Sequence, residues 1–163
     1  MRYEPDRTGD SRGDAAPRRR VGCSAKNNSS CVIVRSLILV PHGQEIARRA
    51  GVSRPESVRL LAVPEIPLPA EADLRQAARQ FDLITQDTAG LTIGDGIFER
   101  EQCLKDAKLV THELMHVAQY ERHGSILGFL ARYLSECNEF GYPAAPMEQE
   151  AIAFAESICP QTR

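Results

Sequence analysis

The sequence contains no tryptophan and no apolar run near the roughly 20 residues that a membrane-spanning helix needs. Its best apolar run, Cys31 to Val40, is broken by Arg35. Three consecutive arginines at 18–20 precede this run, as in the basic start of a signal peptide. However, the arginine inside the run and the lack of a clear small-residue cleavage site argue against one. We therefore expect a cytoplasmic protein with no membrane partner rather than a secreted protein.

The sequence also lacks a C-x-x-C pair. Its five cysteines are odd in number and widely spaced, at positions 23, 31, 103, 137 and 159. This distribution argues against a cysteine-ligated zinc site and against a dense disulfide framework. Reduced thiols are therefore the expected state of all five side chains.

A basic stripe interleaved with aromatic residues is missing too. The formal net charge is -2, and residues 1–30 carry seven basic and four acidic side chains, so the other 133 residues have a net charge of -5. A domain with that balance is not expected to bind nucleic acid.

The first 30 residues differ in composition from the rest of the chain. They are rich in Arg, Asp, Gly, Ser and Asn and contain few apolar residues. Such a segment cannot bury enough surface to offset the entropy lost on ordering, so we expect a disordered tail over 1–30. Residues 31–163 are long enough for one domain with its own core.

Apolar patterning predicts an α+β fold for this domain, with a small mixed sheet early and helices late. Positions 74, 77, 78 and 81 are apolar and have the i, i+3, i+4, i+7 spacing of one helix face. Between two strand-forming stretches, Gly94-Asp95-Gly96 predicts a hairpin turn, a bulge or a close approach of another backbone. In chain order, the predicted elements are a helix over 45–50 ended by Gly51, a strand over 58–63, a helix over 71–83, strands on either side of 94–96, and helices over about 102–122, 125–138 and 146–158.

Residues 112–116 read His-Glu-Leu-Met-His and match the H-E-x-x-H pattern. Positions four apart share one helix face, so His112 and His116 can both point at one zinc ion, which binds nitrogen at about 2.0–2.1 Å. Glu113 lies about 100° around the helix from His112. It is therefore placed to act as general base on a metal-polarised water.

The surrounding sequence supports a helix with two different faces. An apolar stripe would pack against a core, while His112, His116 and Gln119 fall on another face and can line a cleft. The alternative is that these are surface histidines on an amphipathic helix. The stripe consists of positions 103, 107, 110, 114 and 117.

A catalytic zinc site with an open position needs a third protein ligand. The metzincin solution would place glycine at 118 and histidine at 122, but the chain has Ala118 and Arg122 there. His123 is one residue out of register and lies about 16 Å along the helix axis from His112. We therefore interpret His123 as a polar residue near a helix C-terminus rather than as a ligand.

The other solution takes a carboxylate from the helix over 146–158. On its helical wheel, Glu148 lies about 60° from the centre of the apolar side and Glu150 about 100°. Glu148 also lies beside Ala151 and Ala155, small residues that let two helices approach closely. Glu148 is the favoured third ligand and Glu150 the reserve. The alternative is that both are solvated charges on an amphipathic helix.

Two segments, "HELMHVAQYERHG" and "YPAAPMEQEA", resemble the small bacterial HExxH metallopeptidases of the gluzincin type. Those proteins carry H-E-L-x-H-V-x-Q followed by a proline-preceded E-x-E-A. The resemblance extends over about residues 53–155. It implies a minimal zincin-like core with zinc on His112, His116 and Glu148, and with Glu113 as base. It also implies an edge strand, "AGLTIGDGIF", above the zinc helix.

The sequence departs from that family at one position. Many gluzincins place an aspartate four residues after the glutamate ligand to hold a metal histidine by its second nitrogen. Here that position is Ile152, so such support must come from elsewhere. Tyr142 is the favoured donor to the oxyanion of a tetrahedral intermediate, ahead of His123 and of Tyr133, which we assign to the core. Gln119 either supports the site or is solvated.

These observations predict a zinc metallopeptidase that hydrolyses peptide bonds of a peptide or protein substrate, with Zn²⁺ as cofactor. Glu113 would accept the proton of the attacking water and pass it to the leaving amine. One alternative is a zinc-stabilised, non-proteolytic binding or regulatory module on the same fold, because 163 residues leave little material for a deep cleft. Another is a metal-free interaction domain in which the motif is accidental.

Overall fold

A computed structural model describes residues 35–80 and 83–160 of the protein. The tail predicted over 1–30 lies outside these residues, as does the stretch 81–82 of the helix predicted over 71–83. The described part of the chain has the predicted α+β fold with a small mixed sheet, which has four strands, and five α-helices. In this part, no helix is both long and apolar enough to cross a membrane.

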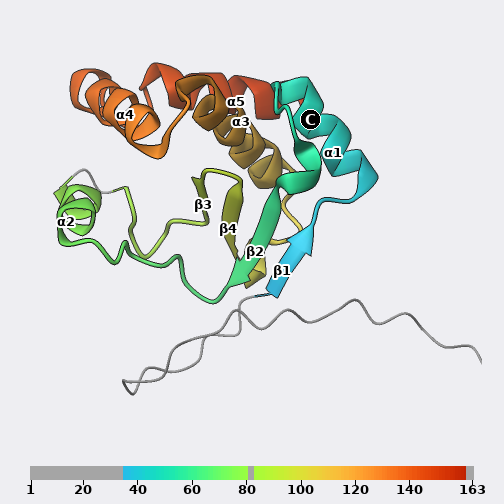
Figure 1. The fold of residues 1–163 in the computed structure, drawn as a ribbon, viewed down its shortest axis with the longest axis horizontal. Coiled ribbons are helices and arrows are strands. Elements are labelled where there is room, and N and C mark those ends of the chain that lie inside the picture. The colour runs from blue at the N-terminus through green and yellow to red at the C-terminus, as the bar shows by residue number, and fades with distance from the viewer. Residues whose placement is uncertain (1–34, 81–82, 161–163) are drawn as a thin grey trace, which may run out of the picture. The chain divides into compact units, whose positions relative to one another are not determined.

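The sheet has the strand order β1-β2-β4-β3 (Figure 1). β2 (Arg59–Val63) pairs antiparallel with β1 (Arg35–Ile38) and parallel with β4 (Gly96–Arg100). β3 (Gly90–Ile93) and β4 form an antiparallel hairpin, which confirms the turn predicted at 94–96. Gly94 has a φ of 59°, a conformation that glycine adopts without a Cβ penalty. Because β3 is last in the strand order, it forms one edge of the sheet among the described strands.

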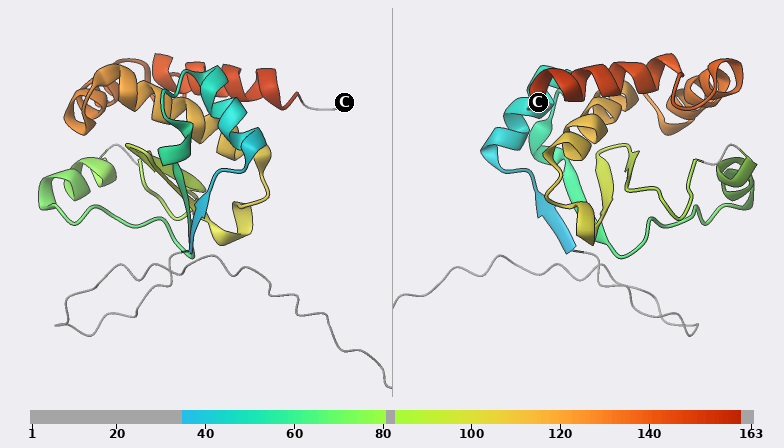
Figure 2. Two further views of the ribbon diagram at one scale, coloured as in Figure 1. Left: turned by 45° about the vertical axis from the view of Figure 1, so that its right-hand side comes forward. Right: turned by 180° about the vertical axis from the view of Figure 1, so that it is seen from behind.

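The central helix of the domain is α3. It contacts α5, α1 and α4 as well as β3 and β4. Figure 2 shows α3 between the sheet and α5, so the H-E-x-x-H segment lies between the edge strand and the last helix. The helices are α1 (Pro41–Ala50), α2 (Ala72–Gln80), α3 (Ala107–His123), α4 (Ile126–Phe140) and α5 (Pro146–Ile158), with two short 3-10 turns, η1 (Pro55–Ser57) and η2 (Glu101–Cys103).

Local signals set both ends of α3. The Asp106 carboxylate accepts hydrogen bonds from the backbone N–H groups of Lys108 and Leu109, at 3.0 and 3.1 Å, and so satisfies two donors of the first turn. Gly124 ends the helix with a φ of 70°, a left-handed conformation that favours glycine. The helix therefore begins after Asp106 and not near residue 102, where the chain forms η2 instead.

The main core lies between α1, α3 and one face of the sheet. Ile97 of β4 is fully buried, as are Leu114 and Val117 of α3. The apolar stripe predicted for this helix therefore faces the core from position 110 onward, whereas Cys103 lies in η2 and Ala107 is exposed. A second, smaller cluster of Tyr120, Phe129 and Met147 joins α3, α4 and α5. These two clusters hold α3 against the sheet on one side and against the last two helices on the other.

The sequence prediction missed β1 and the start of α1. Residues 36–38 are all exposed, so this edge strand lacks the alternation by which a half-buried strand is recognised. α1 begins at Pro41, a residue suited to a first helical turn, and not at 45. The predicted bounds of α5 are confirmed.

The two isoleucines of the β3–β4 hairpin provide a test of where the core lies. Ile97 is fully buried, whereas Ile93 is 39% exposed. We expect Ile97→Ala to lower the free energy of unfolding by about 2–5 kcal/mol through lost burial and a cavity, and Ile93→Ala to lower it by less than about 1.5 kcal/mol. Urea denaturation measures both values, and equal losses would contradict this placement of the core.

Candidate metal centre

Two histidines of α3 face one another across one helical turn. His112 Nε2 lies 3.1 Å from His116 Nε2, and the two rings are nearly perpendicular, at 81°. His116 is buried and His112 is half-buried. The spacing of four residues brings these nitrogens together because such positions share one helix face.

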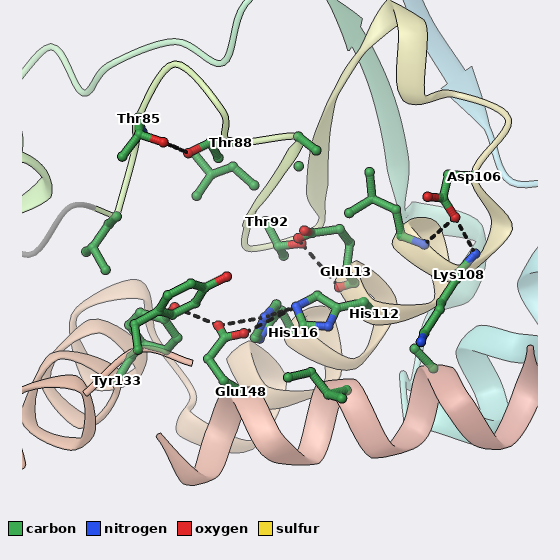
Figure 3. Close-up of a pocket in the computed structure, with 18 of the residues that line it drawn as sticks. Thr85, Thr88, Thr92, Asp106, Lys108, His112, Glu113, His116, Tyr133 and Glu148 are labelled. Atoms are coloured by element: carbon green, nitrogen blue, oxygen red, sulfur yellow. Dashed lines mark hydrogen bonds and ion pairs between the residues drawn. The ribbon is translucent and has the colours of Figure 1, made fainter. Parts of the chain in front are cut away.

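The first turn of α5 adds a carboxylate to this pair (Figure 3). Glu148 is only 2% exposed, with Oε1 3.3 Å from His116 Nε2 and Oε2 3.4 Å from His112 Nε2. The reserve candidate, Glu150, instead pairs with Arg122 at 2.6 Å and is not part of the cluster. His123 also lies outside the cluster, as expected.

The two imidazoles and the carboxylate offer donor atoms at distances that suit a metal ion. Zinc bonds of about 2.0–2.1 Å at the tetrahedral angle separate neighbouring ligand atoms by about 3.3–3.4 Å. The two imidazole nitrogens lie 3.1 Å apart, and each faces a different oxygen of Glu148, His116 at 3.3 Å from Oε1 and His112 at 3.4 Å from Oε2. In the described part of the chain, Glu148 Oε2 is buried without a hydrogen-bond partner, which is costly for a carboxylate oxygen. A cation between these atoms would satisfy it, so the cluster could hold a metal ion.

The neighbours of Glu148 favour its ionised form. Burial opposes ionisation, but the facing imidazoles of His112 and His116 and the hydroxyl of Tyr133 hold the pKa of Glu148 well below its usual range. Burial also opposes protonation of His116, yet its contact with Glu148 raises the pKa of that imidazole. Without a metal, these contacts therefore favour a protonated His116 beside an ionised Glu148.

Tyr133 on α4 has a larger part in the cluster than the sequence indicated. Its ring stacks on Phe129 with centroids 5.5 Å apart, which agrees with a core position. Its hydroxyl, however, donates a hydrogen bond of 2.6 Å to Glu148 Oε1. The assignment of Tyr133 to the core was therefore incomplete. Helical periodicity indicates which face of a helix a ring lies on, but it does not show which group the hydroxyl contacts.

Gln119 provides the support that Ile152 cannot. Its side chain is fully buried, and its Oε1 lies 2.7 Å from His116 Nδ1, the nitrogen that faces away from the cluster. Of the two alternatives for Gln119, burial therefore excludes the solvated one, and the side chain contacts His116. A hydrogen bond at Nδ1 fixes the ring orientation and leaves Nε2 as the nitrogen with a free lone pair.

The edge strand β3 holds the side chain of Glu113. Thr92 Oγ1 donates a 2.6 Å hydrogen bond to Glu113 Oε2, and Glu113 is 5% exposed. Gly90 leaves room for the other oxygen, because a Cβ at this position would lie 2.6 Å from Glu113 Oε1. Sequence analysis did not single out Thr92 or Gly90. The strand and helix meet only in the tertiary fold, so spacing along the chain carries no signal of this contact.

A cleft of about 610 Å³ is lined by the cluster. β3 and the residues before it line one side, and α3, α4 and α5 line the other. Tyr142 also lines the cleft, but it is 63% exposed and has no hydrogen bond to the cluster within the described residues. Its role as an oxyanion donor stays a prediction.

Comparison of the chain with family models, with curated proteins and with solved structures gives no match. The geometry of the site is therefore the basis for assigning its chemistry.

A second buried acid, Glu99, lies near Glu113. It is fully buried on β4 opposite Gly90, and neither carboxylate oxygen has a hydrogen-bond partner in the described part of the chain. Burial, together with the negative charges of Glu113 and Asp106, raises the pKa of Glu99 to about 8. At neutral pH this side chain is therefore mostly a neutral carboxylic acid, as burial beside two other acids favours.

Glu99 makes the stability depend on pH in a defined direction. Between pH 4.5 and about 8 the folded chain binds a proton at Glu99 that the unfolded chain has lost. The extra bound proton stabilises the folded chain at low pH, and this stabilisation is lost as the pH rises through this range. Relative to Glu99→Gln, wild-type protein should become progressively less stable from pH 5 to about 8, as measured by urea denaturation. A constant difference across the range would contradict a neutral Glu99.

Proposed function

We propose that this protein is a zinc-dependent metallopeptidase with a zincin-like core. The observation that carries the proposal is the convergence of His112 Nε2, His116 Nε2 and a Glu148 oxygen, with a further acid, Glu113, beside them on the same helix. Two imidazoles and one carboxylate form the ligand set of a catalytic zinc with an open position. The Glu113 carboxylate is hydrogen-bonded to Thr92 of β3 and is not a member of the cluster.

Each residue has a separate task in this proposal. Zinc held by the cluster supplies Lewis acidity, polarising a water and a substrate carbonyl. Glu113 accepts the proton of the attacking water and returns it to the leaving amine. Thr92 binds Glu113 Oε2, which leaves Oε1 as the oxygen that takes the proton. Tyr133 neutralises part of the charge on Glu148 and holds its carboxylate against the two imidazoles.

The shape of the cleft supports a peptide as substrate. β3 is an edge strand among the described residues, and its residues 90–92 line the cleft beside Glu113. The outer edge of such a strand offers backbone N–H and C=O groups to an extended chain. The cleft has a volume of about 610 Å³, so a chain of this length does form a cleft beside the cluster.

Replacement of Glu113 separates metal binding from turnover. We expect Glu113→Gln to keep the zinc stoichiometry of the wild type and to lower hydrolysis of a peptide library by about 10²–10⁴-fold, because the amide cannot accept the proton. Glu121→Gln is the matched control: it makes the same change on α3, but its side chain bonds to Ser53 outside the cleft. Normal turnover by Glu113→Gln would refute the role of this residue.

Wild-type protein that binds one zinc ion but cleaves no peptide would instead support the non-proteolytic zinc module. Substoichiometric zinc in protein purified without chelator would support the metal-free alternative, in which the motif is accidental.

Gly90 gives a second test, in which no polar group of the site is removed. In Gly90→Ala the new methyl group would lie 2.6 Å from Glu113 Oε1, so the carboxylate has to move. We expect turnover to fall about 100-fold, the order of loss for a displacement near 1 Å, with zinc binding retained. Gly96→Ala, in the same hairpin, is the control because its methyl group meets no atom closer than 3.4 Å. Equal turnover in the two variants would show that β3 does not position Glu113.

A further inference from the structure

Two charged residues outside the cluster are joined to His116 by a continuous chain of hydrogen bonds. Arg122 donates to both oxygens of Glu150, at 2.8 Å to Oε1 and 2.6 Å to Oε2. Gln119 Nε2 donates to the same Oε2 at 2.8 Å, and Gln119 Oε1 lies 2.7 Å from His116 Nδ1. The chain therefore runs from an exposed ion pair, through a fully buried amide, to a member of the cluster.

The surroundings of Gln119 permit one orientation of its amide. Its nitrogen faces the Met147 carbonyl oxygen at 2.9 Å as well as the Glu150 carboxylate, and both of these groups can only accept. A flipped amide would place its oxygen against two acceptors and its nitrogen against His116. With the amide as it stands, Oε1 must receive a hydrogen bond, and His116 Nδ1–H is the donor.

The same amide also fixes α5 against α3. Its two acceptors, Met147 and Glu150, flank Glu148 on the first turn of α5. Loss of the Glu150 carboxylate would therefore act on two members of the cluster. It would leave the Met147 carbonyl as one acceptor for the Gln119 amide where there were two, which weakens the constraint on His116, and it would loosen the turn that carries Glu148.

We propose that Glu150, supported by Arg122, is a positioning residue that acts through Gln119 to hold His116 in its Nδ1–H form and Glu148 in register with it. The inference rests on the proposed metal site, but Glu150, Arg122 and Gln119 lie outside both the cluster and the lining of the cleft. A bidentate guanidinium–carboxylate pair between two helices is a geometrically specific contact. An ion pair that is largely exposed adds little to global stability, so its removal should affect the metal site more than the fold.

The test compares Glu150→Ala and Glu150→Gln with Glu156→Ala. Glu156 lies on the same helix and also makes an exposed ion pair, with Lys108, so Glu156→Ala removes an equal charge. One readout is the zinc dissociation constant, measured by competition with a chromophoric chelator. The other is the nitrogen-15 spectrum of the His116 imidazole in metal-free protein, recorded at a pH above the raised pKa of this ring, where the neutral form carries its proton either on Nδ1 or on Nε2.

We expect Glu150→Ala to weaken zinc binding about 10- to 100-fold, the range found for partners that support metal ligands, and to shift the His116 signal away from the Nδ1–H form. Glu150→Gln should recover part of the affinity, since one amide oxygen can replace Oε2, which serves both Gln119 and Arg122. Glu156→Ala should match the wild type in both readouts.

Three results would overturn the proposal: zinc affinity and a His116 signal unchanged in Glu150→Ala, an equal loss of affinity in Glu156→Ala, or a loss of affinity with the imidazole signal unmoved. If wild-type protein bound no zinc, the proposed function would fail, but the metal-free spectra of wild type and Glu150→Ala would still decide this inference. If Glu150→Ala failed to fold by circular dichroism, Arg122→Met and Glu150→Gln would decide it by the same readouts.

Discussion

Glu148 is an acidic side chain with almost no contact with water, and an ionised carboxylate in such a place costs free energy unless every oxygen is paired. Tyr133 satisfies one oxygen, and the other has no hydrogen-bond partner among the described residues. The imidazole nitrogens that face it also face each other at 3.1 Å. Only a proton or a cation between them makes this arrangement stable, so the packing of α5 against α3 and the chemistry of the site depend on the same contact.

Four elements of the fold each supply one part of the site. α3 provides both imidazoles and Glu113, and α5 brings Glu148. α4 contributes Tyr133, and its Glu136 accepts a 2.8 Å hydrogen bond from the backbone N–H of Met147, which caps α5 where no local side chain does. β3 holds Glu113 through Thr92. In the proposed mechanism this separation is useful, because the sheet would fix the base and the helices would fix the metal ligands.

The sequence predicted those parts of the site that depend on local geometry. His112 and His116 are one helical turn apart, and any helix places them together. Glu148 was preferred to Glu150 from its position on the helical wheel, and the structure brings Glu148 into the cluster. Thr92, the hydroxyl of Tyr133 and the burial of Gln119 could not be predicted with the same certainty, because each depends on how separate elements pack. β1 was missed for a related reason: an exposed edge strand has no alternating pattern to report it.

Zinc X-ray absorption spectroscopy of protein loaded with one equivalent of zinc tests the central claim most directly. We predict a shell of nitrogen and oxygen neighbours at about 2.0–2.1 Å. We also predict the outer-shell signal of two imidazoles in the wild type and of one imidazole in His116→Ala. A sulfur shell at about 2.3 Å, or a spectrum of hydrated zinc that His116→Ala leaves unchanged, would contradict the assignment of His112, His116 and Glu148 as ligands.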